Sequence, residues 1–180
     1  MMIKILFWNC QGAVSQSFRR IFKDMISRNK PQVAVLMETR VSKRAADSIV
    51  HNLGFPNSIR VEAQEFSGGI WLLWKGNIYM DILQASKQFI HGRRKTKVNE
   101  KGIISTVVYA SHRVEKRKML WSKIHQLDPG NNEACVVGGD FNAILKQNEM
   151  RGGKQRRNGV SRSFTDFVFD TCLHDVKTLG

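Results

Sequence analysis

The sequence predicts an α/β fold in which layers of β-sheet and α-helix share a hydrophobic core. Short apolar runs typical of buried strands alternate with segments whose apolar residues recur at helical spacing. Hydrophobic residues make up 42% of the 180 residues and charged residues 24%, which is the composition of a folded protein. The length suits one domain with its own core, so we expect a single domain over residues 1–180.

The strands are predicted from β-branched and aromatic runs that end at polar residues or glycine. The predicted strands, in order, cover residues 3–8, 33–37, 69–74, 82–90, 103–109 and 135–138. A basic, hairpin-like loop is predicted over residues 93–97, between the fourth and fifth of these strands. The alternation of strands with helices is typical of layered α/β proteins.

The helices are predicted from apolar residues spaced three and four apart. They lie around residues 18–26, 45–53, 119–127 and 164–172, and the third has Met119, Leu120, Ile124 and Leu127 on its apolar face. Ser15 or Ser17 is placed to cap the first helix, and Gly54 follows the second at the C-cap position. Pro31 and Pro129 stop the first and third helices.

The charge of the chain favours a polyanionic partner. Lys plus Arg is 29 and Asp plus Glu is 15, so the formal net charge is +14. Such a surplus favours nucleic acid first and an anionic membrane surface second, and no apolar run is long enough to span a bilayer. A basic run is often only a solvated face, but three clusters in one chain favour contacts to a phosphate backbone. The predicted backbone contacts are Arg93, Arg94, Lys95, Arg151, Lys154, Arg156 and Arg157.

The three cysteines indicate an intracellular protein. Cys10, Cys135 and Cys172 cannot all pair with one another, and none of them lies in a CxxC motif. We expect reduced thiols, no disulfide-linked partner and a monomer. The apolar segment within the first eight residues is too short to act as a secretory signal, because the polar residue Asn9 ends it.

Polar side chains stand where several predicted strands end. These residues are Asn9, Glu38, Tyr109, Asp140 and Asn142. Ligands gather at strand ends in layered α/β folds, and carboxylate and amide oxygens there suit Mg²⁺. Four of these residues also have a simpler interpretation. Asn9 and Asp140 could be turn residues, Glu38 an ion-pair partner of Arg40, and Tyr109 a strand aromatic.

Five motifs occur in an order that resembles a known family. They are Trp8–Gly12 (WNCQG), Leu36–Arg40 (LMETR), Ser67–Ile70 (SGGI), Val108-Tyr109 and Gly138–Asn142 (GGDFN). Together they resemble the endonuclease/exonuclease/phosphatase superfamily, most closely the apurinic-endonuclease-like domain of LINE-type (non-LTR) retrotransposons. The resemblance implies two packed, mostly antiparallel β-sheets flanked by helices.

The resemblance also implies a chemistry and a set of roles. Asn9 and Glu38 would hold a catalytic Mg²⁺, for which Mn²⁺ could substitute, together with Asp140 and Asn142. Asp140 would activate the attacking water, Asn142 would contact the scissile phosphate, and Tyr109 would donate a hydrogen bond to that phosphate. The implied activity is a hydrolase that cuts phosphodiester bonds in DNA, an endonuclease of the retrotransposon type that acts in the nucleus.

The chain departs from the family pattern in two places. The family pattern includes a terminal Ser-Asp-His segment that this sequence lacks, and Gln11 stands where an acidic residue is frequent. We therefore expect a C-terminally truncated copy whose last strands are missing. Two alternatives follow: a catalytically inactive fragment that binds nucleic acid, and a phosphatase of the same superfamily.

Overall fold

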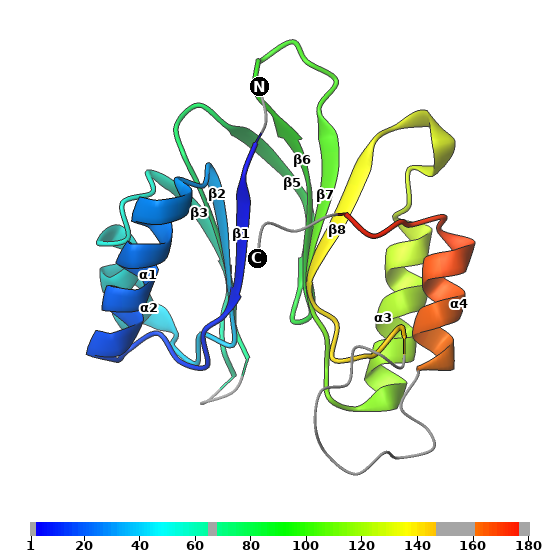
Figure 1. Cartoon of the computed structure of the whole chain (residues 1–180), viewed down its shortest axis with the longest axis horizontal. Coiled ribbons are helices and arrows are strands. Elements are labelled where there is room, and N and C mark those ends of the chain that lie inside the picture. Colours follow the sequence, from blue (N-terminus) through cyan, green and yellow to red (C-terminus); the bar gives the residue numbers. More distant parts are fainter. Residues whose placement is uncertain (1–2, 65–67, 147–160, 177–180) are drawn as a thin grey trace. The chain divides into compact units, whose positions relative to one another are not determined.

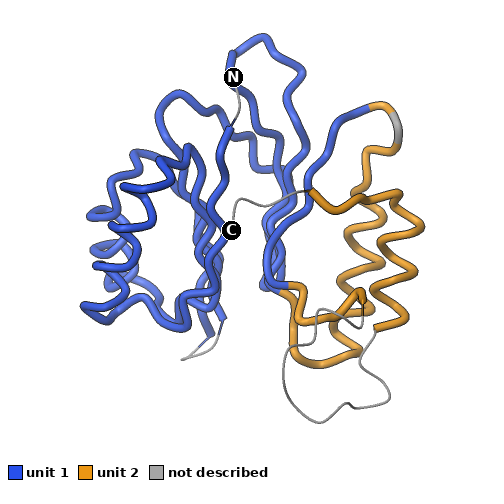
Figure 2. The backbone as a smooth tube through the Cα atoms, in the orientation of Figure 1, with its two compact units in different colours: residues 1–109, 133–140 blue, residues 110–132, 141–180 orange. Residues whose placement is uncertain are grey.

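The computed structural model describes residues 3–64, 68–146 and 161–176 of the chain. These residues form two compact units, shown in different colours in Figure 2. The first unit comprises residues 1–109 and 133–140, and the second comprises residues 110–132 and 141–180. The strands of the described residues all belong to the first unit.

The first unit is built on two four-stranded mixed sheets (Figure 1). One sheet has the order β1-β2-β4-β3, with β1 at Ile5–Asn9, β2 at Val33–Met37, β4 at Ile70–Trp74 and β3 at Asn57–Val61. The other has the order β5-β6-β7-β8, with β5 at Tyr79–Ser86, β6 at Phe89–Lys95, β7 at Ile103–Tyr109 and β8 at Cys135–Asp140. Strand β1 runs parallel to β2 and β7 parallel to β8, whereas the other pairings are antiparallel. The predicted fold of two packed, mostly antiparallel sheets is confirmed.

The two sheets share an apolar core between their facing surfaces. Side chains alternate between the two faces of a strand, so every second residue of β2 and β4 points into this core. The first sheet contributes the buried residues Val33, Val35, Met37, Ile70 and Leu72. The second sheet contributes Ile90 of β6 and Val107 of β7, and Ile78, which directly precedes β5, also belongs to this core. This core holds the two sheets face to face, and the polar ends of their strands lie at its border.

Two helices, α1 (Gln16–Asn29) and α2 (Lys43–His51), cover the other face of the first sheet (Figure 1). The remaining alternate residues of the sheet, Ala34, Leu36, Trp71 and Leu73, pack with Phe18, Phe22, Ala46, Ile49 and Val50 of the helices. The Trp8 and Phe18 rings stack with their centroids 5.2 Å apart. Phe18, Phe22 and Trp71 are buried in this layer.

The helix ends follow the sequence in part. The Ser15 hydroxyl accepts a hydrogen bond from the Phe18 amide at 3.1 Å, so Ser15 is the N-cap of α1. Helix α1 ends at Lys30, which adopts a left-handed φ of 48° just before Pro31. Helix α2 ends at Asn52, so the prediction of Gly54 as its C-cap is wrong.

The second unit is organised by an aromatic cluster. Helix α3 (Val114–Gln126) and helix α4 (Arg162–Asp170) contribute Trp121, Phe164 and Phe167, whose rings pack with centroids 5.0–6.2 Å apart. A short 3₁₀ helix, η1, lies at Gly130–Asn132.

Within residues 3–64, 68–146 and 161–176, no helix has the length and apolar character needed to cross a bilayer.

Several predicted boundaries are wrong. Strand β3 was not predicted, and the strand expected over 82–90 is two strands, β5 and β6, joined by a turn at Lys87-Gln88. The apolar residues on both sides of this short polar turn made the hairpin look continuous. Met119 of α3 is 73% exposed, because Trp121 takes its place on the buried face. Cys172 lies beyond the end of α4.

The three cysteines differ in their exposure. Cys10, Cys135 and Cys172 are free thiols. Cys10 and Cys135 are half-buried in the first unit, and Cys172 is exposed.

Gly139 is a position that tolerates no side chain. Its φ is +141°, and a Cβ there would lie 1.9 Å from the carbonyl oxygen of Val108 in the neighbouring strand. We expect Gly139→Ala to lower the free energy of unfolding by about 2–4 kcal/mol through backbone strain and overpacking.

Urea unfolding followed by tryptophan fluorescence measures this loss. Gly76→Ala is the matched control, because a Cβ at Gly76 meets only Pro56 at 3.9 Å and should change stability by less than about 0.5 kcal/mol. Equal stability of the two variants would contradict the backbone clash.

Candidate active site

Asn9 and Asp140 join the ends of two strands from different sheets. Asn9 is the last residue of β1 and Asp140 the last of β8. The amide Nδ2 of Asn9 donates a hydrogen bond of 2.8 Å to Oδ2 of Asp140. Both side chains are half-buried. The two predicted site residues therefore meet directly, although 131 positions separate them in the sequence.

The close approach of β1 and β8 depends on Gly138. A Cβ at Gly138 would lie 2.6 Å from the ring of Phe7, which stands two residues before Asn9 on the same face of β1. Gly138 likewise stands two residues before Asp140 on β8. Because Gly138 has no side chain, the Phe7 ring can lie against β8 and the strand ends come within hydrogen-bonding distance.

Tyr109 lies beside Asp140. It ends β7 and is paired with Asp140 in the parallel register of β7 and β8. Burial raises the pKa of the Tyr109 hydroxyl, and the negative charges of Glu38 and then Asp140 raise this pKa further. Both carboxylates therefore act on the same hydroxyl. At neutral pH the phenol keeps its proton and is a hydrogen-bond donor.

Glu38 follows β2 and forms an ion pair with Arg40. Oε1 of Glu38 accepts hydrogen bonds from Nε of Arg40 at 3.1 Å and from a terminal guanidinium nitrogen of Arg40. The Glu38 side chain is 15% exposed and the Arg40 side chain 45% exposed. The hydrogen bonds and charge of Glu38 raise the pKa of Arg40. The pair that the sequence offered as a simpler interpretation is thus present, next to Tyr109.

The segment that carries Glu38 is held by its backbone. The amide of Ala13 donates to the carbonyl of Thr39 at 2.9 Å, and the amide of Arg40 donates to the carbonyl of Gly68 at 3.0 Å. Thr39 is fully buried between them. A Cβ at Gly69 would lie 2.3 Å from Oγ1 of Thr39, so glycine is required at that position. Glu38 and Arg40 therefore project from a fixed loop.

Cys10 lies next to Asn9. Its thiol donates to the carbonyl oxygen of Met37 at 3.3 Å. Burial, the largest cause, raises the pKa of the Cys10 thiol to about 11, and the charge of Glu38 contributes to the rise. The thiol is therefore neutral under physiological conditions and is a poor nucleophile.

Asn142 belongs to the second unit. It has a left-handed φ of 45°, and its Nδ2 donates to the carbonyl oxygen of Ala110 at 2.7 Å. Asn9 and Asp140 are thus in contact, and Tyr109 experiences the charges of Glu38 and Asp140, whereas Asn142 is bonded within its own unit. The phosphate role expected for Asn142 stays a prediction.

The side chains of the first unit fit a hard divalent cation. Oδ1 of Asn9 is a buried oxygen without a hydrogen-bond partner. Amide and carboxylate oxygens are the donors that Mg²⁺ prefers, and Asn9, Glu38 and Asp140 provide both kinds. In the described part of the chain no group of three or more His, Cys, Asp or Glu side chains could hold a metal ion. A donor set at these strand ends would therefore include the amide oxygen of Asn9.

The prediction of a basic loop over residues 93–97 is wrong for its first three residues. Arg93, Arg94 and Lys95 belong to β6. Arg93 pairs with Glu133 at 2.8 Å, Lys95 pairs with Asp81 at 2.8 Å, and Arg94 is only 7% exposed. Contacts of these residues with nucleic acid stay a prediction. The other predicted contacts, Arg151, Lys154, Arg156 and Arg157, lie outside the described residues.

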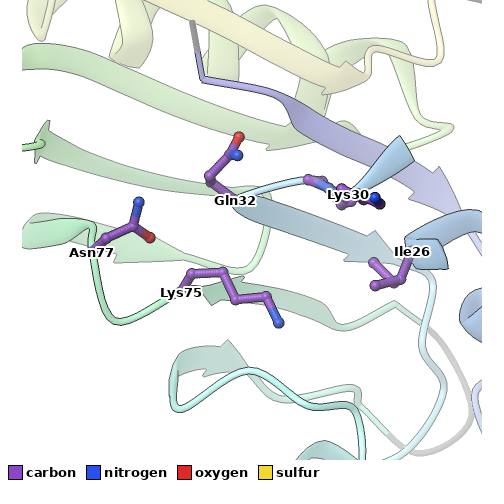
Figure 3. A pocket seen from close by; sticks show the side chains of 6 residues that line it. Ile26, Lys30, Gln32, Lys75 and Asn77 are labelled. Atoms are coloured by element: carbon purple, nitrogen blue, oxygen red, sulfur yellow. The ribbon is translucent and has the colours of Figure 1, made fainter. Parts of the chain in front are cut away.

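A pocket of about 320 Å³ lies elsewhere in the first unit (Figure 3). It is lined by Ile26, Lys30, Pro31, Gln32, Lys75 and Asn77. Gln32 directly precedes β2, whereas Glu38 follows that strand, so the pocket and the candidate site lie at opposite ends of β2. Figure 3 shows the Gln32 and Lys75 side chains pointing away from each other, and the Lys75 amine donates to the carbonyl of Gly54 at 2.6 Å. The Gln32 and Lys75 side chains therefore do not converge in the pocket.

The first unit is thus a two-sheet α/β sandwich with amide, carboxylate and phenol groups at adjoining strand ends. Residues 6–173 match the Endonuclease/Exonuclease/phosphatase family. The chain belongs to this family. Members of the family are hydrolases that act on phosphodiester bonds, and they generally use divalent metal ions.

Solved structures with the same fold include two AP endonucleases. The chain is similar to an AP endonuclease from Archaeoglobus fulgidus with a TM-score of 0.66 and 15% identity, over 95% of this chain and 70% of that one. It is similar to the AP endonuclease LMAP from Leishmania major with a TM-score of 0.71 and 14% identity, over 94% of this chain and 66% of that one. The chain thus spans about two thirds of the length of these proteins.

A third similar structure is that of a phosphatase. The 3′ phosphatase NExo from Neisseria, bound to a product DNA hairpin, matches with a TM-score of 0.57 and 13% identity, over 81% of this chain and 60% of that one. At these identities the similarities establish the fold. No curated protein sequence matches the chain.

The Asn9–Asp140 hydrogen bond should contribute measurably to stability. We expect Asn9→Ala to lower the free energy of unfolding by about 1–2 kcal/mol, because it removes a half-buried bond to a carboxylate. Asn29→Ala is the control, since it removes an exposed hydrogen bond of 3.0 Å from the side-chain amide to the carbonyl of Met25. It should lower the free energy of unfolding by less than about 0.5 kcal/mol. Urea unfolding that finds the two variants equal would contradict the role of Asn9 as a link between the sheets.

The raised pKa of Cys10 predicts slow alkylation. The folded thiol holds its proton from pH 9, its ordinary pKa, to about pH 11. At pH 9 we therefore expect iodoacetamide to modify Cys10 about fifty times more slowly in the folded chain than in the urea-unfolded chain. Peptide mass spectrometry measures both rates, and the folded rate should rise until about pH 11.

The same shift has a consequence for stability. Between pH 9 and about pH 11 the unfolded thiol loses its proton and the folded thiol keeps it, so the contribution of Cys10 to stability falls as the pH rises. A folded-state alkylation rate that levels off near pH 9 would show that the thiol is not shifted.

Proposed function

We propose that the chain is a Mg²⁺-dependent endonuclease that hydrolyses phosphodiester bonds within DNA, of the apurinic-endonuclease-like type found in LINE-type retrotransposons. The single observation that carries the proposal is the Asn9–Asp140 hydrogen bond of 2.8 Å. It brings together strand ends of two sheets, with Tyr109 beside Asp140 and the charge of Glu38 acting on Tyr109. Family membership and the AP endonuclease folds support this choice.

Asp140 is the general base in this proposal. Its carboxylate accepts the proton of a water molecule as that water attacks phosphorus. The hydrogen bond from Asn9 fixes the orientation of this carboxylate, so that its position needs no adjustment when the substrate arrives. The parallel pairing of Tyr109 with Asp140 fixes it from the other neighbouring strand.

Tyr109 and Asn142 are the donors to the phosphate. Tyr109 keeps its proton because burial and two carboxylates raise its pKa, and it can therefore donate to a non-bridging oxygen. Asn142 follows Asp140 by two residues and is the second proposed donor. Both side chains are half-buried, which strengthens such hydrogen bonds.

Asn9, Glu38, Asp140 and Asn142 are the proposed Mg²⁺ ligands, and Mn²⁺ would suit the same oxygen donors. When bound, the ion supplies electrostatic stabilisation of the negative charge that grows on the phosphate. The protein contributes the fixed positions of its oxygens, above all the buried Oδ1 of Asn9.

The partner proposed is the phosphate backbone of DNA, and the proposed form and place are a monomer in the nucleus. The net charge of +14 favours a polyanion. Two structures with this fold contain DNA: the Neisseria phosphatase NExo with a DNA hairpin and the D. rerio protein TDP2 with single-stranded DNA, at TM-scores of 0.57 and 0.51. The basic residues 151–157 are proposed to contribute backbone contacts.

A second candidate function is the removal of a terminal phosphate from DNA. The similarity to the Neisseria 3′ phosphatase favours it. The two activities share the attacking water and the phosphate donors and differ in the leaving group. A nicked duplex that carries a 3′ phosphate distinguishes them, because only a phosphatase releases inorganic phosphate from it.

Conservative substitutions test the roles of the two carboxylates. We expect Asp140→Asn and Glu38→Gln to slow the nicking of supercoiled plasmid by about 10²–10⁴-fold, because each removes a negative charge but keeps the size of the side chain. Asp140→Asn still offers an oxygen to the amide of Asn9, and Glu38→Gln one to Arg40, so both variants should fold. EDTA should abolish nicking by the unmodified chain.

The control is Asp24→Asn on helix α1. Asp24 is half exposed and pairs only with Arg28 in the described structure, so its loss changes the net charge equally but should leave nicking within twofold. Full activity of Asp140→Asn or Glu38→Gln would refute the assigned roles. Salt-dependent DNA binding with no nicking by the unmodified chain would instead support the inactive nucleic-acid-binding alternative.

A further inference from the structure

Arg40 has no role in the proposed chemistry, yet it forms an ion pair with Glu38, which is a proposed ligand of the divalent cation. Its Nε and one of its terminal guanidinium nitrogens both donate to Oε1 of Glu38. The same carboxylate is a proposed ligand of the divalent cation. A guanidinium and a divalent cation on one carboxylate weaken each other's binding by charge repulsion.

The backbone is built to hold this pair. Glu38 and Arg40 have φ values of 55° and 56°, a left-handed region that such residues rarely adopt. The segment keeps this conformation through hydrogen bonds to the carbonyls of Thr39 and Gly68 and through the burial of Thr39. The backbone of both residues is therefore held where their side chains can meet.

The two partners differ in their freedom to move. The Glu38 side chain is 15% exposed, whereas the Arg40 side chain is 45% exposed. Arg40 can thus leave the pair for solvent without a rearrangement of the core, while Glu38 stays in place. A carboxylate in this setting is more stable with a cation beside it than without one.

Arg40 also lies close to the proposed phosphate site. Its amide donates to the carbonyl of Gly68, and a Cβ at Gly68 would lie 3.8 Å from the ring of Tyr109, the proposed donor to the phosphate. A guanidinium presents a planar fork of N–H donors that matches phosphate as well as carboxylate. Once Glu38 has another cation, phosphate is the natural next partner for Arg40.

We propose that Arg40 is the resident counterion of Glu38, that a divalent cation replaces it there, and that the released guanidinium binds a phosphate of the nucleic acid. This inference rests on the proposed function, because it takes Glu38 as a metal ligand. It makes binding of the cation and binding of the substrate mutually reinforcing, since each draws away one partner of the same ion pair.

Calorimetric titration of the whole chain with Mn²⁺, without DNA, tests the first step. We expect Arg40→Ala to bind Mn²⁺ about three to five times more tightly than the unmodified chain, the range of an exposed ion pair. Arg40→Lys, which keeps the charge, should lie within twofold of the unmodified chain. The difference for Arg40→Ala should shrink at high salt.

Arg28→Ala is the matched control. It also removes one positive charge and breaks an arginine–carboxylate pair, with Asp24 at 2.8 Å, on helix α1. It should leave the affinity for Mn²⁺ unchanged. Equal or weaker binding by Arg40→Ala would overturn the inference while leaving Glu38 as a ligand.

Failure of the proposed function has a different signature. If Glu38→Gln binds Mn²⁺ as tightly as the unmodified chain, Glu38 is not a ligand, and both the metal site and the inference are wrong. Weaker binding by Glu38→Gln together with tighter binding by Arg40→Ala supports both.

A phosphorothioate DNA duplex, which resists hydrolysis, tests the second step. Fluorescence anisotropy with EDTA and then with Mg²⁺ should show a gain in affinity for the unmodified chain that is at least threefold larger than the gain for Arg40→Ala. An equal gain in the two proteins would refute phosphate binding by the released guanidinium.

Discussion

The hydrogen bond between Asn9 and Asp140 is the contact on which the candidate site depends. It connects the last residues of β1 and β8, which belong to different sheets. Its length of 2.8 Å requires the two strands to approach closely. Gly138 permits that approach, because glycine has no Cβ that would clash with the Phe7 ring. The apolar core between the sheets supplies the rigidity. The positions of the polar site residues thus depend on apolar neighbours: Gly138, Phe7 and the core between the sheets.

The local balance of charge in the site differs from that of the chain. The chain has a net charge of +14, but the strand ends gather two carboxylates, Glu38 and Asp140, around the hydroxyl of Tyr109. Arg40 is the cation found beside them in the described structure of this loop. A site with a negative surplus inside a positive protein suits a reaction in which a cation and a polyanion must meet.

Regular features of the fold were predicted well and irregular ones poorly. Strands β1, β2, β4 and β7 were recognised, because continuous runs of β-branched and aromatic residues mark buried strands. The short edge strand β3 was missed, since an edge strand has weaker patterning. The hairpin of β5 and β6 was taken as one strand, and Arg93–Lys95 as a loop, because the two-residue turn at Lys87-Gln88 contains neither glycine nor proline.

The positions of Asn9, Tyr109 and Asp140 at strand ends could be predicted from the sequence, because local patterning decides where an apolar run stops and a polar residue begins. The bond from Asn9 to Asp140 could not be predicted from the sequence, and the ion pair of Glu38 with Arg40 was one of two interpretations that the sequence left open. The first of these contacts spans 131 positions and depends on how two sheets pack. The second depends on two left-handed backbone conformations that no residue preference signals. Contacts of this kind are set by the packing of the whole unit, which local sequence does not encode.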